Sequence, residues 1–107
     1  MKRIALVALL VATVPTAHAG VIFGNITVNN KPLAATNLTI TCNSSYSAST
    51  NEQGSYSVRV NELGKCTLTL SYDGQQPSQS VYSTEGSARH DFRLERDAAG
   101  NWYLRAQ

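Results

Sequence analysis

Cys42 and Cys66 are the only cysteines of this 107-residue chain, and the segment between them holds its most regular sequence pattern. From Ser55 to Val60, polar and apolar residues alternate, which is the period of a β-strand with one buried face. The polar run before this strand ends at Gly54, whose permissive backbone suits a tight turn. The two cysteines are therefore predicted to bracket a turn and a strand.

Both cysteines are also in phase with apolar residues of the strands predicted around them. Cys42 follows Leu38 and Ile40 at alternate positions, and Cys66 begins a similar alternation. Both thiols are predicted to point toward the core, so we expect a Cys42–Cys66 disulfide. Closing a loop of about 25 residues contributes roughly 3.5 kcal/mol to stability. No Cys-x-x-Cys motif and no histidine cluster accompanies the pair, so a structural bridge is expected and no metal site.

Residues 1–19 are typical of a secretory signal peptide. Lys2 and Arg3 precede an apolar run of about eleven residues, and a small-x-small tripeptide ends at Ala19. Cleavage is predicted between Ala19 and Gly20, which leaves one domain over residues 20–107. An uncleaved anchor is the alternative, but a span needs roughly twenty apolar residues. We expect a periplasmic or secreted protein without a membrane span, in a compartment that permits disulfides.

The charge balance argues against two classes of partner. The whole chain has a formal charge of +2, with nine basic and seven acidic residues. Lys2 and Arg3 leave with the signal, so the mature domain is neutral. A neutral domain has no general attraction for nucleic acid or for anionic membranes, and neither is predicted as a partner.

Every segment after the signal is predicted as strand or turn, and none shows helical periodicity over ten residues. Gly24, inside the first apolar stretch, predicts a bulge or a close approach of another backbone. Residues 43–49 are serine-rich and fit a loop or a weak strand. Six to eight short strands with turns every eight to twelve residues predict an all-β fold, an antiparallel β-sandwich of about seven strands.

The first half of the mature chain carries a recurring order of motifs. A glycine opens a strand at 24–28, a Pro-Leu and two small residues lead into a strand at 32–40, and Thr-x-x-x-Gly-x-Tyr leads into alternating apolar residues at 50–60. This order resembles the carboxypeptidase regulatory-like domain, a transthyretin-like (prealbumin-like) β-sandwich, over about residues 21–72. The resemblance implies a non-catalytic accessory module. Ala35 departs from it, because the family often has glycine there.

The residue inventory offers little for catalysis. His90 is the only histidine of the mature chain, and it is in phase with Phe92 and Leu94, which predicts a packing role. Its neighbour Asp91 points to the opposite face and cannot orient it directly. No catalytic residue, cofactor or metal ligand is predicted, because a triad or a zinc site would need more partners.

The candidate contact residues are therefore surface residues. Among the aromatic residues, Tyr46 and Tyr103 are predicted to be exposed, whereas Tyr72, Tyr82 and Trp102 are predicted to be core or half-core. Arg89 and Arg93 belong to an outward stripe of alternating charge.

Two functions remain open. The first is a non-catalytic exported module that binds another periplasmic or secreted protein through an edge strand or end loops. The alternative is a carbohydrate-binding module that recognises a cell-envelope glycan with exposed aromatic residues.

Overall fold

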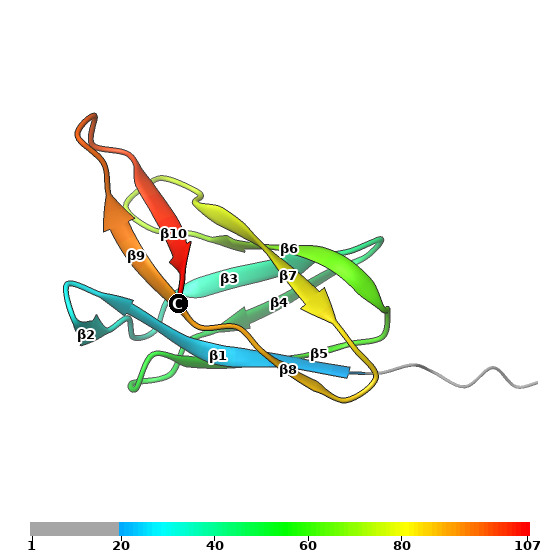
Figure 1. Cartoon of the computed structure of the whole chain (residues 1–107). Coiled ribbons are helices and arrows are strands. Elements are labelled where there is room, and N and C mark those ends of the chain that lie inside the picture. The colour runs from blue at the N-terminus through cyan, green and yellow to red at the C-terminus, as the bar shows by residue number, and fades with distance from the viewer. Residues whose placement is uncertain (1–19) are drawn as a thin grey trace, which may run out of the picture.

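The computed structural model describes residues 20–107, so the predicted signal peptide and its last residue, Ala19, lie outside the described residues. The described chain forms ten strands and no helix, arranged in two sheets (Figure 1). The predicted all-β class is therefore confirmed, as is the Cys42–Cys66 disulfide. The hairpin at the end of the chain, orange to red in Figure 1, projects at one end of the molecule.

The larger sheet, here the β1 sheet, is built around a central strand that pairs on both sides. On one side β1 is antiparallel to β5 along its first part and to β2 along its last residues. On the other side β1 runs parallel to β8 and β9, and β10 pairs antiparallel with β9 at the sheet edge. The strands are β1 (Gly20–Val28), β2 (Lys31–Pro32), β5 (Ser55–Val60), β8 (Ser87–Arg89), β9 (Phe92–Arg96) and β10 (Trp102–Ala106).

The smaller sheet, the β3 sheet, is antiparallel throughout, in the order β4-β3-β6-β7. Residues 45–49, for which the sequence left loop and strand open, form its edge strand β4. The strands are β3 (Asn37–Thr41), β4 (Ser45–Ser49), β6 (Gly64–Leu70) and β7 (Ser78–Ser83).

The structure departs from the predicted antiparallel sandwich of about seven strands in the number of strands, which is ten, and in the direction of one pairing. β2 has only two residues, and β8 and β9 are parts of one extended segment that keeps one register along β1. Phe23 lies opposite Arg89 and Ile26 opposite Phe92, so the interruption inserts no extra residue. The parallel pairing of this segment was not predicted, because alternation of side chains fixes faces and not strand direction.

The core fills the space between the sheets and draws on both. Its members are almost all the inward positions of the alternating strands, and each large aliphatic side chain buried there contributes about 1.5–3 kcal/mol. They are Ile22, Ile26, Leu33, Leu38, Ile40, Tyr56, Val58, Val60, Cys66, Leu68, Leu70, Val81, Phe92, Leu94 and Leu104.

The disulfide continues the pairing of β3 with β6. Thr41 lies opposite Thr67, and the next residue of each strand toward the turn end is a cysteine. The Cα atoms of Cys42 and Cys66 are 4.5 Å apart, the spacing of directly opposed residues in an antiparallel pair. Cys66 is buried and Cys42 packs against the core, as their phase predicted.

Candidate functional site

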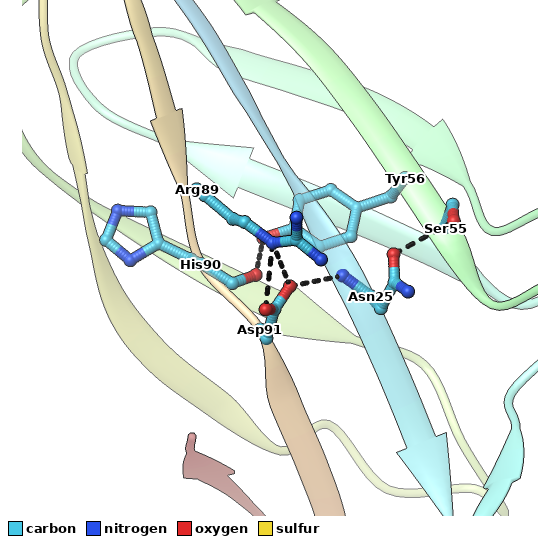
Figure 2. Close-up of polar contacts among 6 residues, drawn as sticks. All are labelled: Asn25, Ser55, Tyr56, Arg89, His90 and Asp91. Carbon is cyan, nitrogen blue, oxygen red and sulfur yellow. Dashed lines mark hydrogen bonds and ion pairs between the residues drawn. The ribbon is translucent and has the colours of Figure 1, made fainter.

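The site begins at the interruption between β8 and β9, where His90 and Asp91 leave the ladder with β1 (Figure 2). His90 N–H still donates to the carbonyl of Phe23 (2.8 Å). In an unbroken parallel ladder, the next bond would run from Asn25 N–H to the carbonyl of His90. Two side chains replace that bond: Asn25 N–H donates to Oδ1 of Asp91 (2.8 Å), and the Tyr56 hydroxyl donates to the His90 carbonyl (2.7 Å).

Gly24 allows this arrangement because the backbone of the interruption lies directly against it. A Cβ atom at position 24 would overlap the carbonyl oxygen of His90 and would lie 2.9 Å from Oδ1 of Asp91. The sequence offered two interpretations of this glycine, and the structure shows the close backbone approach and not a bulge. A side chain here would separate the β8–β9 segment from β1.

Tyr56 supports the interruption from inside the sandwich. Its side chain is 3% exposed and belongs to the core, while its hydroxyl reaches the His90 carbonyl. Burial raises the pKa of Tyr56 far above its usual value, and the nearby Asp91 carboxylate acts in the same direction. The phenol is therefore a neutral donor at every physiological pH.

Asp91 holds an arginine on the outer surface. Nε of Arg89 donates to Oδ1 and Oδ2 of Asp91 at 3.1 and 2.9 Å, while Oδ1 also accepts the Asn25 N–H (Figure 2). The side chain of Arg89 is 57% exposed, so its guanidinium remains open to solvent. It also lies 5.8 Å from the ring centroid of Phe23, a cation–π distance.

Most of the charged side chains on the strands lie on the outer face of the β1 sheet. Val21 and Phe23 are half-buried there, with Arg59 opposite Val21 and Arg89 opposite Phe23 on the neighbouring strands. We call this surface the arginine face. Its residues are Val21, Phe23, Arg59, Arg89, Asp91, Arg93, Glu95, Tyr103 and Arg105, which set four guanidinium groups against two carboxylates.

Glu95 organises the end of the arginine face near the β9–β10 hairpin. Its Oε1 accepts from the Tyr103 hydroxyl (2.8 Å), and its oxygens also pair with Arg93 (3.4 Å) and Arg105 (3.6 Å). The Tyr103 hydrogen bond, followed by the two arginines, lowers the pKa of Glu95, and the same bond raises the pKa of Tyr103. Both arginines remain substantially exposed, so this carboxylate fixes them without removing them from solvent.

Arg59 differs from the other arginines of the face. Within residues 20–107 its guanidinium makes no hydrogen bond or ion pair, and its side chain is exposed. An unpaired arginine beside a half-buried apolar strand is free to pair with a carboxylate of another molecule.

The outer face of the β3 sheet has the opposite character. Cross-strand register places hydroxyl groups side by side, with Thr39 opposite Thr69 and Thr41 opposite Thr67. We call this surface the hydroxyl face. Its polar residues are Asn37, Thr39, Thr41, Ser45, Ser47, Ser49, Thr67, Thr69, Ser78 and Ser80, and among the outward positions of these four strands only Lys65 is charged.

His90 occupies the packing position that its phase predicted. Its Nε2 accepts a hydrogen bond from the backbone N–H of Tyr82 (3.1 Å), and its ring lies nearly parallel to Phe92 at 6.4 Å. It therefore links the interruption in the β1 sheet to β7 of the other sheet.

The structure corrects the prediction for two tyrosines. Tyr46, predicted to be exposed, is half-buried against the core, and its hydroxyl donates to Oε2 of Glu62 (2.9 Å). Glu62 also accepts the N–H groups of Asn43 and Ser44 at 2.7 and 2.9 Å, so this carboxylate closes the β3–β4 turn beside the disulfide. Tyr82, predicted to be core or half-core, is 53% exposed on β7 because it occupies an outward position.

The pKa values at this turn follow from the same bonds. The hydrogen bond from the N–H of Asn43 lowers the pKa of Glu62 most, and the bonds from Ser44 and from the Tyr46 hydroxyl act in the same direction. Partial burial and the bond to Glu62 raise the pKa of Tyr46. Tyr46 thus belongs to a structural cluster, whereas Tyr103, at 42% exposure, is the surface aromatic that was predicted.

A second candidate surface surrounds Trp102 at the hairpin end. A shallow hollow of about 420 Å³ is lined by Asn29, Asn30, Arg93, Leu94, Glu95, Arg96 and Trp102. Trp102 is half-buried: Tyr72 meets its ring edge-on at 5.0 Å, and the guanidinium of Arg96 lies 5.3 Å from its centroid. Nε1 of Trp102 donates to Asp73 (3.1 Å), so the ring is held rigidly.

Of the residues predicted for contact, Arg89, Arg93 and Tyr103 share the arginine face, and Tyr46 lies elsewhere. The sequence interpretation missed Phe23 and Arg59. A signal for both was present, because each is an outward position in an alternating strand. Phe23 was read as part of an apolar run, although Ile22 and Ile26 already supply the inward positions of β1.

Residues 20–107 contain no cluster of three or more His, Cys, Asp or Glu side chains that could hold a metal ion. The same residues include no helix with the length and apolarity to cross a membrane. Comparison with models of protein families finds no match, and comparison with curated proteins finds no similar sequence.

Proposed function

We propose that this protein is a non-catalytic exported module that binds another exported protein through its arginine face. The observation that carries the proposal is the grouping of four arginines on one face, with the half-buried Phe23 beside Arg89, while the opposite face of the molecule has almost no charge. Arginine and aromatic residues are enriched in protein interfaces and dominate their binding energy.

The chemistry of this face specifies the partner. Its excess of guanidinium groups favours a surface that carries carboxylates, and such complementarity raises the association rate and selects the partner. Asp91 and Glu95 hold Arg89, Arg93 and Arg105 in place before binding. Less side-chain entropy is then lost on association, because these groups are already ordered.

Other observations support the export and the non-catalytic role. The signal-like residues 1–19 and the disulfide between Cys42 and Cys66 fit a periplasmic or secreted protein. The proposed membership in the carboxypeptidase regulatory-like domains rests on the motif order of residues 21–72. It supports an accessory module and no more specific role, since fold likeness alone does not specify a function.

Site-specific photocrosslinking in the native compartment tests the proposal. A photoreactive residue is placed at Ser57, which is paired with Phe23 of the arginine face, or at Arg105 within that face, and, as a control, at Thr67 on the hydroxyl face. All three positions are exposed strand residues, so the three variants differ mainly in the face that they report on. We expect one protein adduct of defined mass from positions 57 and 105 and none from position 67. Equal crosslinking from both faces, or none from the arginine face, would contradict the proposal.

The hollow beside Trp102 favours a second candidate function, binding of a cell-envelope glycan. Its lining combines an aromatic ring, the amides of Asn29 and Asn30 and charged groups, the mixture that sugar hydroxyls and ring faces contact. Arg96 already lies over the ring, so a sugar must displace it. Titration with soluble cell-wall fragments should quench Trp102 fluorescence saturably, and Trp102→Phe supplies the blank. An unchanged signal across neutral and acidic glycans would remove this candidate.

A further inference from the structure

The longer edge strands of the two sheets are β10, β7, β5 and β4, and β8 adds an edge of only three residues that ends in the charged Arg89. Each of the longer strands can be examined for backbone groups left open to another chain. An exposed edge with free N–H and C=O groups is a template for an added strand, and proteins usually cover or charge such edges. In an antiparallel pair, alternate residues bond to the neighbouring strand and the others direct their backbone groups outward. The register of each pair therefore identifies the outward groups.

The edge of β10 is covered by two glutamine side chains. Gln75 accepts the N–H of Trp102 (2.8 Å) and donates to the carbonyl of Gly100 (3.1 Å). Gln79 donates to the carbonyl of Leu104 (3.1 Å). These are outward groups of the hairpin end and of β10, so this edge is covered at Trp102 and at Leu104.

The edges of β7 and β5 are also protected. On β7 the outward N–H of Tyr82 donates to His90, and that of Ser80 donates to the side chain of Gln79. On β5 the N–H and carbonyl of Ser55 are both bonded to Asn51, and of the two outward residues farther along, Ser57 and Arg59, the second is charged. A charge at an edge opposes an added strand. Beside β5, β2 is only two residues long and contains a proline.

β4 has none of these protections. Cys42 N–H bonds to the carbonyl of Ser44, which sets the phase of the β3–β4 pair and directs the backbone of Ser45, Ser47 and Ser49 away from β3. Within residues 20–107 these three outward N–H groups have no acceptor beyond the sheet. The strand carries no charge and no proline.

The inward side chains of β4 are incompletely covered. Tyr46 and Ala48 pack against the core but stay partly exposed, unlike the inward residues of the central strands β3 and β6. An added strand would bury more of their apolar surface, and its inward residues must be apolar or aromatic to do so. Its outward residues would extend the hydroxyl face and need no charge.

We propose that β4 is a dimerisation edge and that its occupant is β4 of a second copy of this chain. The sequence Ser-Tyr-Ser-Ala-Ser has the polar–apolar alternation that an added strand requires, and the pattern is the same in both directions. Antiparallel pairing centred on Ser47 sets Tyr46 opposite Ala48 of the second copy and Ser45 opposite Ser49. The outward groups then form about six backbone hydrogen bonds. No like charges meet at the two-fold axis, because β4 has none.

The symmetry of this dimer has a consequence for the arginine face. The axis runs perpendicular to the β3 sheet, so the two protomers lie side by side in one continuous sheet of eight strands. Both arginine faces then point in the same direction and could engage a bivalent partner. The dimer itself does not depend on that face. It covers the β4 edge of both protomers, so no β4 edge is left for a third copy.

Amide exchange measured on the purified exported chain, disulfide intact, at about 20 µM and about 1 mM tests the proposal. A five-residue edge buries little area, so the dimer is expected to be weak and to form at the higher concentration. We expect the amides of Ser45, Ser47 and Ser49 to become protected at high concentration. Those of Tyr46 and Ala48, already bonded to β3, serve as controls in the same strand and should not change. No concentration dependence at the serines would overturn the proposal.

Charge variants test the register. Ser47→Lys sets two lysines directly opposite each other at the axis and should raise the dissociation constant roughly fivefold, whereas Thr67→Lys, two strands inward, should not. The double variant Ser45→Lys with Ser49→Glu creates two opposite-charge pairs across the dimer only in this register. It should lower the dissociation constant in low salt. A dimer that survives Ser47→Lys unchanged would overturn the proposed axis. Because no other protein is present, these outcomes are independent of the crosslinking result.

Discussion

Replacing Tyr56 by phenylalanine tests the account of the interruption between β8 and β9. The substitution removes one hydroxyl that donates at 2.7 Å to the His90 carbonyl, and leaves the ring in the core. An intramolecular hydrogen bond contributes about 1 kcal/mol, and a carbonyl left without a partner adds to the loss. We expect a decrease of about 1–2 kcal/mol in unfolding free energy, or roughly 5–15 °C in Tm for a domain of this size.

Urea unfolding followed by Trp102 fluorescence and far-UV circular dichroism at pH 7 measures this loss. Tyr103→Phe is the matched control, because its hydroxyl also donates to a single acceptor but lies on the surface, and its loss should have a clearly smaller effect. The difference between Tyr56→Phe and wild type should also depend on pH. The pKa of Tyr56 is raised in the folded state, so its contribution is complete below pH 10 and is lost as the pH rises above 10.

Two results would refute this reasoning. A Tyr56→Phe variant as stable as wild type would mean that the His90 carbonyl finds another donor, such as the N–H of Asn25. Equal losses for Tyr56→Phe and Tyr103→Phe would mean that burial does not set the value of the bond. A double-mutant cycle with Asp91→Ala tests whether the two side chains act together. Both replace the same ladder bond, so the losses of stability in Tyr56→Phe and Asp91→Ala should not add.

Four further expectations concern the scaffold. Replacing Cys42 and Cys66 by alanine should lower stability by about 2–5 kcal/mol, and the unreduced protein should show no free thiol on titration after unfolding. Gly24→Ala should cost more than about 2 kcal/mol in denaturant unfolding, because its Cβ would overlap the backbone of the β8–β9 interruption. Ala35→Gly should raise Tm, since Ala35 has φ of 51°, a left-handed conformation that favours glycine. The carboxyl of Glu62 should titrate below 4.5 by NMR, so its stabilising effect is present above that pH and is lost as the pH falls through the lowered pKa; Glu62→Gln should remove this dependence.

Alternation in the sequence was sufficient to predict the inner faces of the strands. Cys66, Val58 and Leu94 are buried where their phase placed them, and the disulfide follows because two inward cysteines stand opposite each other on paired strands. The family resemblance drew attention to Ala35, and the structure gives that position the backbone conformation of a glycine. The burial of each strand residue and the backbone at Ala35 are local features, and the chain has only two cysteines to pair, so these features could be predicted from the sequence.

The remaining features depend on contacts between distant segments. Alternation does not state that the β8–β9 segment runs parallel to β1, nor that Asp91 replaces a backbone acceptor for Asn25, 66 residues earlier in the chain. Phe23 was not recognised as a neighbour of Arg89, nor Arg59 as a member of the same face, for the same reason. Edge protection also escaped prediction, because Gln75 and Gln79, which cover β10, belong to a polar segment whose composition does not indicate the edge that it reaches.

Binding measurements on the partner identified by crosslinking test the central claim most directly. Arg59→Ala removes a side chain that makes no hydrogen bond or ion pair within residues 20–107, so the fold should be unaffected. Lys65→Ala removes one charge from the opposite sheet and is the control. We expect Arg59→Ala to weaken binding at least tenfold, as loss of an interface arginine often does, with Lys65→Ala unchanged. Equal affinities for wild type and Arg59→Ala, or equal losses in both variants, would contradict the assignment of the arginine face as the binding surface.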